Sequence, residues 1–255
     1  MHIIPPHHRA NFFKDITNLG RTNSKIDALK AENERLKSEL IFNDNVLGEL
    51  EQLKGVLNLA GKARYKVVSA RVISKGGTGT FGETVVLDAG SDSGIKRDMT
   101  VIADAGLVGV VKSTTKSSSV VLLMSDPSFR IGVRVAGSQD MGILSGQGGS
   151  RYLLEMLSAT GKINSGDVLL TRGSAGDRPF VPGIPIGTVK SVDLNIGQLT
   201  KRAQVEGFVD LNSVSVVSIV TKSSGTNPGD ALVPRAPAPA PTVTIYVTPT
   251  PSPTK

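Results

Sequence analysis

Apolar residues recur in a heptad pattern between Lys25 and Leu59, and no other part of the chain repeats it. A spacing of 3.5 residues places these side chains in one narrow stripe along a helix, and such a stripe is buried best against another helix. The pattern predicts a coiled-coil helix over residues 25–60 that pairs with a second copy of the chain. The predicted oligomerisation seam consists of Ile26, Leu29, Asn33, Leu36, Leu40, Leu47, Leu50 and Leu57.

The polar residues in and beside this stripe predict a weak parallel dimer. Asn33 at a core position can hydrogen-bond its symmetry mate in a parallel dimer, which lowers stability but favours that state. The flanking charges add little, since Lys25 faces Lys30 across the seam and Lys54 lies within it. An alternative that the periodicity leaves open is an amphipathic helix lying on its own domain.

The pattern changes after Tyr65 to short β-branched runs separated by turns of Gly, Asp and Ser. Runs spaced by roughly 8–15 residues are typical of an all-β barrel or sandwich, not of alternating βα units. The region is longer than one small barrel needs, so two small barrels are predicted. The expected strands are residues 66–73, 83–88, 99–103, 107–111, 120–124, 132–136, 167–171, 187–192 and 214–220.

The predicted fold class is therefore mainly β with one long N-terminal α-helix: a coiled coil followed by two small β-barrel domains. A basic, juxtamembrane-like segment occupies residues 1–24, and Gly61 is expected to end the helix. The first barrel is expected over residues 64–117, with a possible returning strand near 203–220, and the second over 118–220. Residues 221–255 are Pro-rich and should be extended and disordered, because alternating prolines cannot hydrogen-bond as a strand or helix.

Charge and composition narrow the possible partners. A net charge of +7 and a pI near 9.7 suit a chain that works beside anionic lipid headgroups, cell-wall polymer or nucleic acid. Nucleic acid is not expected, because the cations are scattered and are not interleaved with aromatic residues. The absence of cysteine excludes disulfides and thiolate chemistry. No apolar run approaches the roughly 18 residues of a membrane span, and residues 1–10 lack the apolar core of a signal peptide.

No catalytic, cofactor-binding or metal-binding residue is predicted. His2, His7 and His8 all precede the expected domains, whereas a Ser-His-Asp arrangement needs an imidazole held rigidly against the serine. The glycines of residues 77–82 match the spacing of a dinucleotide fingerprint. That motif needs a helix N-terminus after it, and here a strand-like run follows. A glycine-rich hairpin loop is predicted at this position.

Several segments, in the right order, resemble the rod shape-determining protein MreC family. The likeness covers roughly Lys25 to Val220. The first of these segments is Glu32–Leu36, in the predicted coiled coil. The others lie in the β region, at residues 82–90, 94–99, 105–111, 118–126, 166–171 and 182–189.

This resemblance implies a protein anchored by an N-terminal membrane helix, with its barrels on the extracytoplasmic face of the cell membrane. That helix is not among these residues. The family carries two small barrels distantly like chymotrypsin-type barrels, without their catalytic residues. The implied partners are a second copy, the class B penicillin-binding protein (a transpeptidase), MreD and other rod-complex proteins.

The expected function is a non-catalytic scaffold of the bacterial cell-elongation complex, which positions or activates peptidoglycan synthases to control cell shape. One alternative is a coiled-coil plus β-barrel adaptor of a membrane transport or secretion assembly. Such adaptors usually insert a helical hairpin between barrel segments, whereas here one helix precedes all the strands. A second alternative is an enzyme with a protease-like barrel, which labelling of a reactive serine would reveal.

Overall fold

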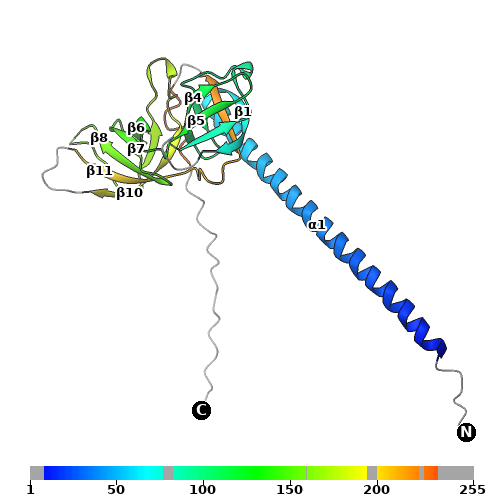
Figure 1. Cartoon of the computed structure of the whole chain (residues 1–255). Helices are drawn as coiled ribbons and strands as arrows, with labels where there is room; N and C mark the ends of the chain where they lie inside the picture. Colours follow the sequence, from blue (N-terminus) through cyan, green and yellow to red (C-terminus); the bar gives the residue numbers. More distant parts are fainter. Residues whose placement is uncertain (1–8, 77–82, 159, 194–199, 224–226, 235–255) are drawn as a thin grey trace, which may run out of the picture.

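One long helix precedes all the strands and projects away from a pair of β-barrels (Figure 1). The computed structural model describes residues 9–76, 83–158, 160–193, 200–223 and 227–234. Helix α1 (Arg9–Ala63) has 55 residues and extends about 80 Å at the usual rise of 1.5 Å per residue. It begins sixteen residues ahead of the predicted start at residue 25.

The end of α1 is set by Arg64 rather than by Gly61. The helix continues through Gly61 to Ala63, and Arg64 then adopts a left-handed φ of 58°. The amide of Tyr65 donates to the carbonyl of Ala60 at 2.9 Å. A left-handed residue with this backbone bond is a common way to end a helix. The chain then enters its first strand.

The first barrel contains strands from both ends of the β region. Its closed order is β1-β12-β3-β4-β5-β2, with antiparallel neighbours. The predicted division at residue 117 falls in the tight turn between β4 and β5, and β5 pairs with β4 and β2 in the first barrel. A short turn necessarily makes its two strands antiparallel neighbours. The strands are β1 (Lys66–Lys75), β2 (Thr84–Leu87), β3 (Thr100–Ile102), β4 (Leu107–Thr114), β5 (Ser119–Leu123) and β12 (Val216–Lys222).

The second barrel is formed by the intervening strands, in the closed order β10-β11-β8-β7-β6-β9. The predicted fold class of one helix followed by two small barrels is confirmed. Strands β7, β8 and β11 were not predicted. The strands are β6 (Arg130–Val135), β7 (Met141–Gly146), β8 (Arg151–Met156), β9 (Val168–Thr171), β10 (Pro185–Asp193) and β11 (Arg202–Gly207).

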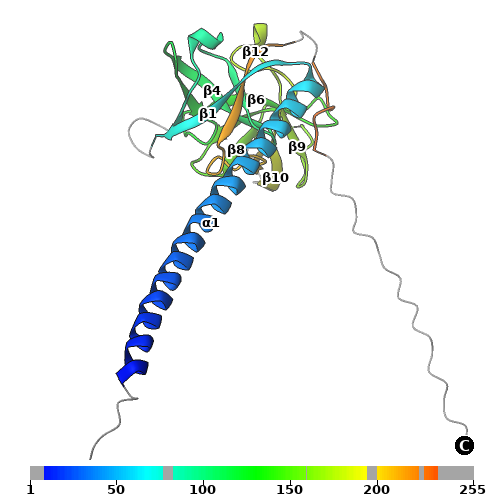
Figure 2. The ribbon, with the colours of Figure 1, turned by 90° about the vertical axis from the view of Figure 1, so that its right-hand side faces the viewer.

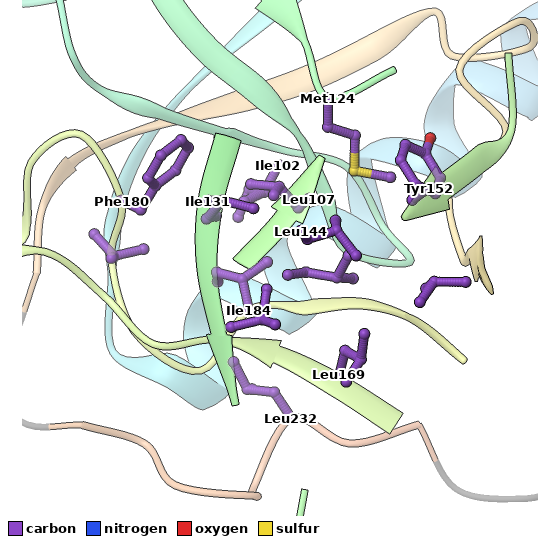
Figure 3. Close-up of a cluster of buried hydrophobic side chains, with 14 of the residues drawn as sticks. Ile102, Leu107, Met124, Ile131, Leu144, Tyr152, Leu169, Phe180, Ile184 and Leu232 are labelled. Carbon is purple, nitrogen blue, oxygen red and sulfur yellow. The ribbon is translucent and has the colours of Figure 1, made fainter. Parts of the chain in front are cut away.

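A continuous apolar core joins the two barrels. Leu144 and Leu169 of the second barrel belong to the same buried cluster as Ile102 and Leu107 of the first (Figure 3). A polar bridge accompanies it: the hydroxyl of Thr100, on β3, donates to the carbonyl of residue 179 at 2.9 Å and accepts from the amide of residue 181 at 3.0 Å. The barrels are therefore packed as one body.

Part of the expected Pro-rich tail is folded onto the barrels. Strand β12 continues to Lys222, and residues 227–234 pack against the second barrel. Leu232 is only 5% exposed and belongs to the core cluster, because it supplies a large apolar side chain within the Pro-rich sequence. Disorder is therefore the wrong expectation for residues 221–222 and 227–234. Residues 235–255 lie outside the described residues.

Candidate functional site

The leucine seam predicted on α1 is exposed to solvent in the single chain. Figure 2 shows most of the helix extending beyond the barrels. Asn33 is also exposed, and Ile26 lies in the helix although its side chain is outside the described residues. An apolar row of this length on one side of a helix is a candidate interaction surface. The exposed fractions are 70% for Leu29, 46% for Leu36, 63% for Leu40, 57% for Leu47, 43% for Leu50 and 49% for Leu57.

A second apolar stripe, distinct from the seam, holds the last turns of α1 on the barrels. Val56, Leu59, Ala60 and Ala63 are buried, at the spacing of one helix face. Gly55 permits the close approach, since a Cβ atom there would lie 2.5 Å from the Cβ of Asp104. The heptad pattern missed this stripe. Its signal in the sequence is the run of small residues, which lets a helix approach its neighbour closely.

Polar contacts fix the same end of the helix to the first barrel. The Oε1 atom of Gln52 accepts from the backbone amides of Ser215 at 3.2 Å and Val216 at 3.1 Å, where β12 begins. Glu49 and Arg71 form an ion pair at 3.1 Å. That pair is largely exposed and stabilises little. The direction in which the helix leaves the barrels is therefore set by about its last four turns.

Buried polar side chains in the barrels complete backbone hydrogen bonding. The Thr171 hydroxyl donates to the carbonyl of Val181 at 2.6 Å and accepts from the amide of Ile184 at 2.9 Å. Ser119 donates to the carbonyl of Ala89 at 2.6 Å. Each hydroxyl is thereby occupied in holding a loop or turn.

Burial and hydrogen bonds within the fold shift the pKa values of three further groups. Burial acts to raise the pKa of Asp126, but hydrogen bonds from Ser128 and from the amide of Glu83 outweigh it and lower the value. Burial, assisted by the charge of Glu83, raises the pKa of Tyr152. Burial likewise raises the pKa of Tyr65, whose hydroxyl donates to a backbone carbonyl.

The described residues contain no group of three or more His, Cys, Asp or Glu side chains placed to hold a metal ion. The three histidines and the glycines of residues 77–82 lie outside the described residues. Strand β2 follows that glycine motif, in agreement with the strand predicted there. Within the part of the chain that the structure describes, no helix is both long and apolar enough to cross a bilayer.

In the described residues, one long helix with an exposed row of leucines precedes two fused six-stranded barrels. This is the architecture of a protein in which a helical rod carries a double β-barrel. Residues 72–221 match the family described as "Rod shape-determining protein MreC, barrel core". The chain belongs to the MreC family. Three relatives are called cell shape-determining protein MreC: 31% identical over 83% of this chain in Listeria monocytogenes, 34% over 74% in Caulobacter vibrioides and 32% over 69% in Escherichia coli.

Solved structures agree with this assignment. A structure entitled MreC aligns with a TM-score of 0.62 and 27% identity, covering 69% of this chain and 98% of that one. The structure of MreC from Listeria monocytogenes covers 85% of this chain and 97% of its own, with a TM-score of 0.56 and 27% identity. The chain spans 68% of the Listeria relative's sequence, 54% of the Caulobacter sequence and 50% of the Escherichia sequence.

Proposed function

We propose that this protein is a non-catalytic scaffold of the bacterial cell-elongation complex. In this proposal, two copies pair through the leucine seam, and their barrels position or activate a peptidoglycan synthase to control cell shape. The observation that carries it is the exposed seam on a helix whose base is fixed to the barrels. The relatives named as cell shape-determining proteins support the same role.

The strength of the proposed pairing follows from the exposed fractions. Fully burying a leucine contributes about 1.5–3 kcal/mol, and the seam leucines are roughly half exposed in the single chain. Six from each copy would contribute on the order of 10–15 kcal/mol. Association costs about 4–15 kcal/mol in lost translational and rotational freedom. The balance is small, so we expect a weak dimer that additional partners or a shared membrane surface would strengthen.

The proposed setting is the extracytoplasmic face of the cell membrane. The proposed partners are the class B penicillin-binding protein, a transpeptidase, together with MreD and other rod-complex proteins. A helix about 80 Å long would hold the barrels at a defined distance from the membrane. The barrels would then present a rigid face to the synthase, because one apolar core joins them.

Self-association is tested by placing charges in the seam. The double variant Leu36→Asp, Leu40→Asp should sediment as a monomer in analytical ultracentrifugation at concentrations where the unmodified chain dimerises. Ile41→Asp is the matched control, because Ile41 and Leu40 are both 63% exposed but only Leu40 lies in the seam. If the unmodified chain remains monomeric at high concentration, pairing through the seam is refuted.

The scaffold role needs its own test. The extracytoplasmic part of the transpeptidase from the same bacterium should bind the immobilised chain in an interferometry assay. Binding should raise the rate at which that enzyme cross-links peptidoglycan. The seam variant should retain binding per copy, because the barrels do not depend on pairing. Absence of both binding and activation would refute the scaffold role even if the chain dimerises.

A further inference from the structure

Residues 227–234 pack against the second barrel through three side chains at alternate positions. Pro228 lies over Gly183, whose positive φ of 81° and missing Cβ make room for it; a Cβ would lie 2.5 Å from the proline ring. Asp230 pairs with Arg134 of β6 at 2.6 Å. Leu232 is buried at the edge of the core cluster, near Ile184 (Figure 3).

The Arg134 side chain, only 11% exposed, is the polar centre of this surface. Asp230 interacts with its Nη1 atom and accepts a second hydrogen bond from the amide of Gly137 at 2.9 Å. The hydrogen bond from Arg134 is the main reason that the pKa of Asp230 lies below its ordinary value. The surface therefore recognises a carboxylate beside an apolar side chain.

Asp230 does not satisfy all the hydrogen-bond donors of Arg134. The Nη2 atom of Arg134 is buried and has no hydrogen-bond partner among the residues that the structure describes. A buried donor without an acceptor is costly, and a carboxylate that engages both terminal nitrogens binds arginine more strongly than one that engages a single nitrogen. Asp230 thus fills the site without using its full binding capacity. A ligand whose carboxylate reaches both nitrogens would bind better.

We propose that residues 227–234 occupy, within the same chain, a socket that binds an acidic segment of a partner protein. The socket consists of Arg134, Gly137, Gly183 and the apolar site of Leu232. The partner segment carries a proline, a carboxylate and a large apolar residue at alternate positions, and its carboxylate engages both nitrogens of Arg134. The chain's own segment covers the socket until the partner displaces it. This proposal does not depend on self-association through the seam.

Hydrogen exchange on the full chain tests whether the segment is held by these contacts. The amides of residues 229–233 should be protected in the unmodified chain. The variant Asp230→Asn, Leu232→Ser should exchange there at least about tenfold faster, because it loses a charge-assisted hydrogen bond and a buried leucine. Asp193→Asn is the control, since Asp193 is exposed on β10 and has no ion pair among the described residues. Unchanged protection in the double variant would overturn the proposal.

Peptide binding tests the socket itself. A fluorescein-labelled peptide of sequence NPGDALVP should bind the double variant at least about tenfold more tightly than the unmodified chain, whose socket is filled. A peptide with Glu in place of Asp should bind more tightly still, because the longer side chain can reach both nitrogens of Arg134. Adding Arg134→Lys to the double variant should remove the Glu preference while leaving the circular dichroism unchanged.

A control peptide, NPGNALSP, lacks the carboxylate and has serine in place of valine, while NPGDASVP lacks the leucine. Both should bind the double variant more weakly than NPGDALVP. If the double variant releases its segment but binds NPGDALVP no better than these controls, the socket is not a docking site. A Glu preference that survives Arg134→Lys would also overturn the proposed two-nitrogen recognition.

Discussion

Replacing leucine by alanine should have a different effect in each of the two apolar stripes of α1: it should lower the stability of the monomer in one and weaken the dimer in the other. Leu59 is 8% exposed and lies in the core cluster, whereas Leu40 is 63% exposed and lies in the seam. Leu59→Ala should lower the free energy of unfolding by about 2–5 kcal/mol, through lost burial and the cavity left behind. At about 2–4 °C per kcal/mol for a protein of this size, the melting temperature should fall by roughly 5–15 °C.

Leu40→Ala should leave the stability of the monomer within about 0.5 kcal/mol, the usual range for an exposed site. It should instead weaken the dimer. Two copies each lose about 1–1.5 kcal/mol of burial at this site, so the dissociation constant should rise about 30- to 150-fold. The structural reason is that Leu40 is 63% exposed in the single chain, so in the proposed dimer only the second helix would bury it.

Calorimetry at a protein concentration where the unmodified chain is monomeric separates the two effects, because association otherwise raises the melting temperature by mass action. Sedimentation equilibrium then gives the dimer constants of both variants. A Leu40→Ala monomer that melts as early as the Leu59→Ala monomer would show that the seam packs within the chain, and the assignment of the two stripes would be wrong.

Three further outcomes follow from individual polar groups. Thr100→Val should cost about 2–4 kcal/mol in urea denaturation, because it leaves a buried carbonyl and the amide of Val181 without their partner. Asp126→Asn should destabilise most near pH 7. The pKa of Asp126 is lowered in the folded state, so its ionised form contributes stability above the unfolded pKa of 3.8, and this contribution is lost as the pH falls through the folded pKa. The difference in stability between the variant and the unmodified chain should therefore disappear in acid. Tyr152→Phe removes a buried hydroxyl that has no hydrogen-bond partner within the described part of the chain, so stability should be unchanged or higher. A loss above about 1 kcal/mol would reveal a partner.

Much of the fold could be predicted from the sequence, and the strands that were missed share a physical cause. Strand β7 has glycine at both its second and its last positions, and β8 begins with Arg151 and contains Leu153 and Leu154 in place of β-branched residues. Strand β11 alternates polar residues with Ala203 and Val205. These segments are strands because barrel closure pairs them with neighbours. That tertiary requirement overrides their local propensity.

The parts of the candidate surfaces that sequence reasoning missed depend on contacts between distant segments. The proline content of the tail indicates an extended chain, but nothing in it indicates that Asp230 would meet Arg134, because 96 residues separate them. The returning strand expected near residues 203–220 corresponds to β12, which closes the first barrel from the far end of the sequence. A pattern that repeats locally can be read from one sequence, whereas a contact between two individual side chains far apart in that sequence cannot.

The heptad pattern left two arrangements open for the helix, and the structure explains why periodicity could not choose between them. The last turns of α1 do lie on their own domain, but through Val56, Ala60 and Ala63 rather than through the seam. Leu57, within the same turns, remains 49% exposed. Successive helix residues differ by about 100° in direction, so one segment can present one face to its barrel and another to solvent. The base of the helix therefore fixes the direction of the rod, while the side chains of the predicted seam stay exposed to solvent.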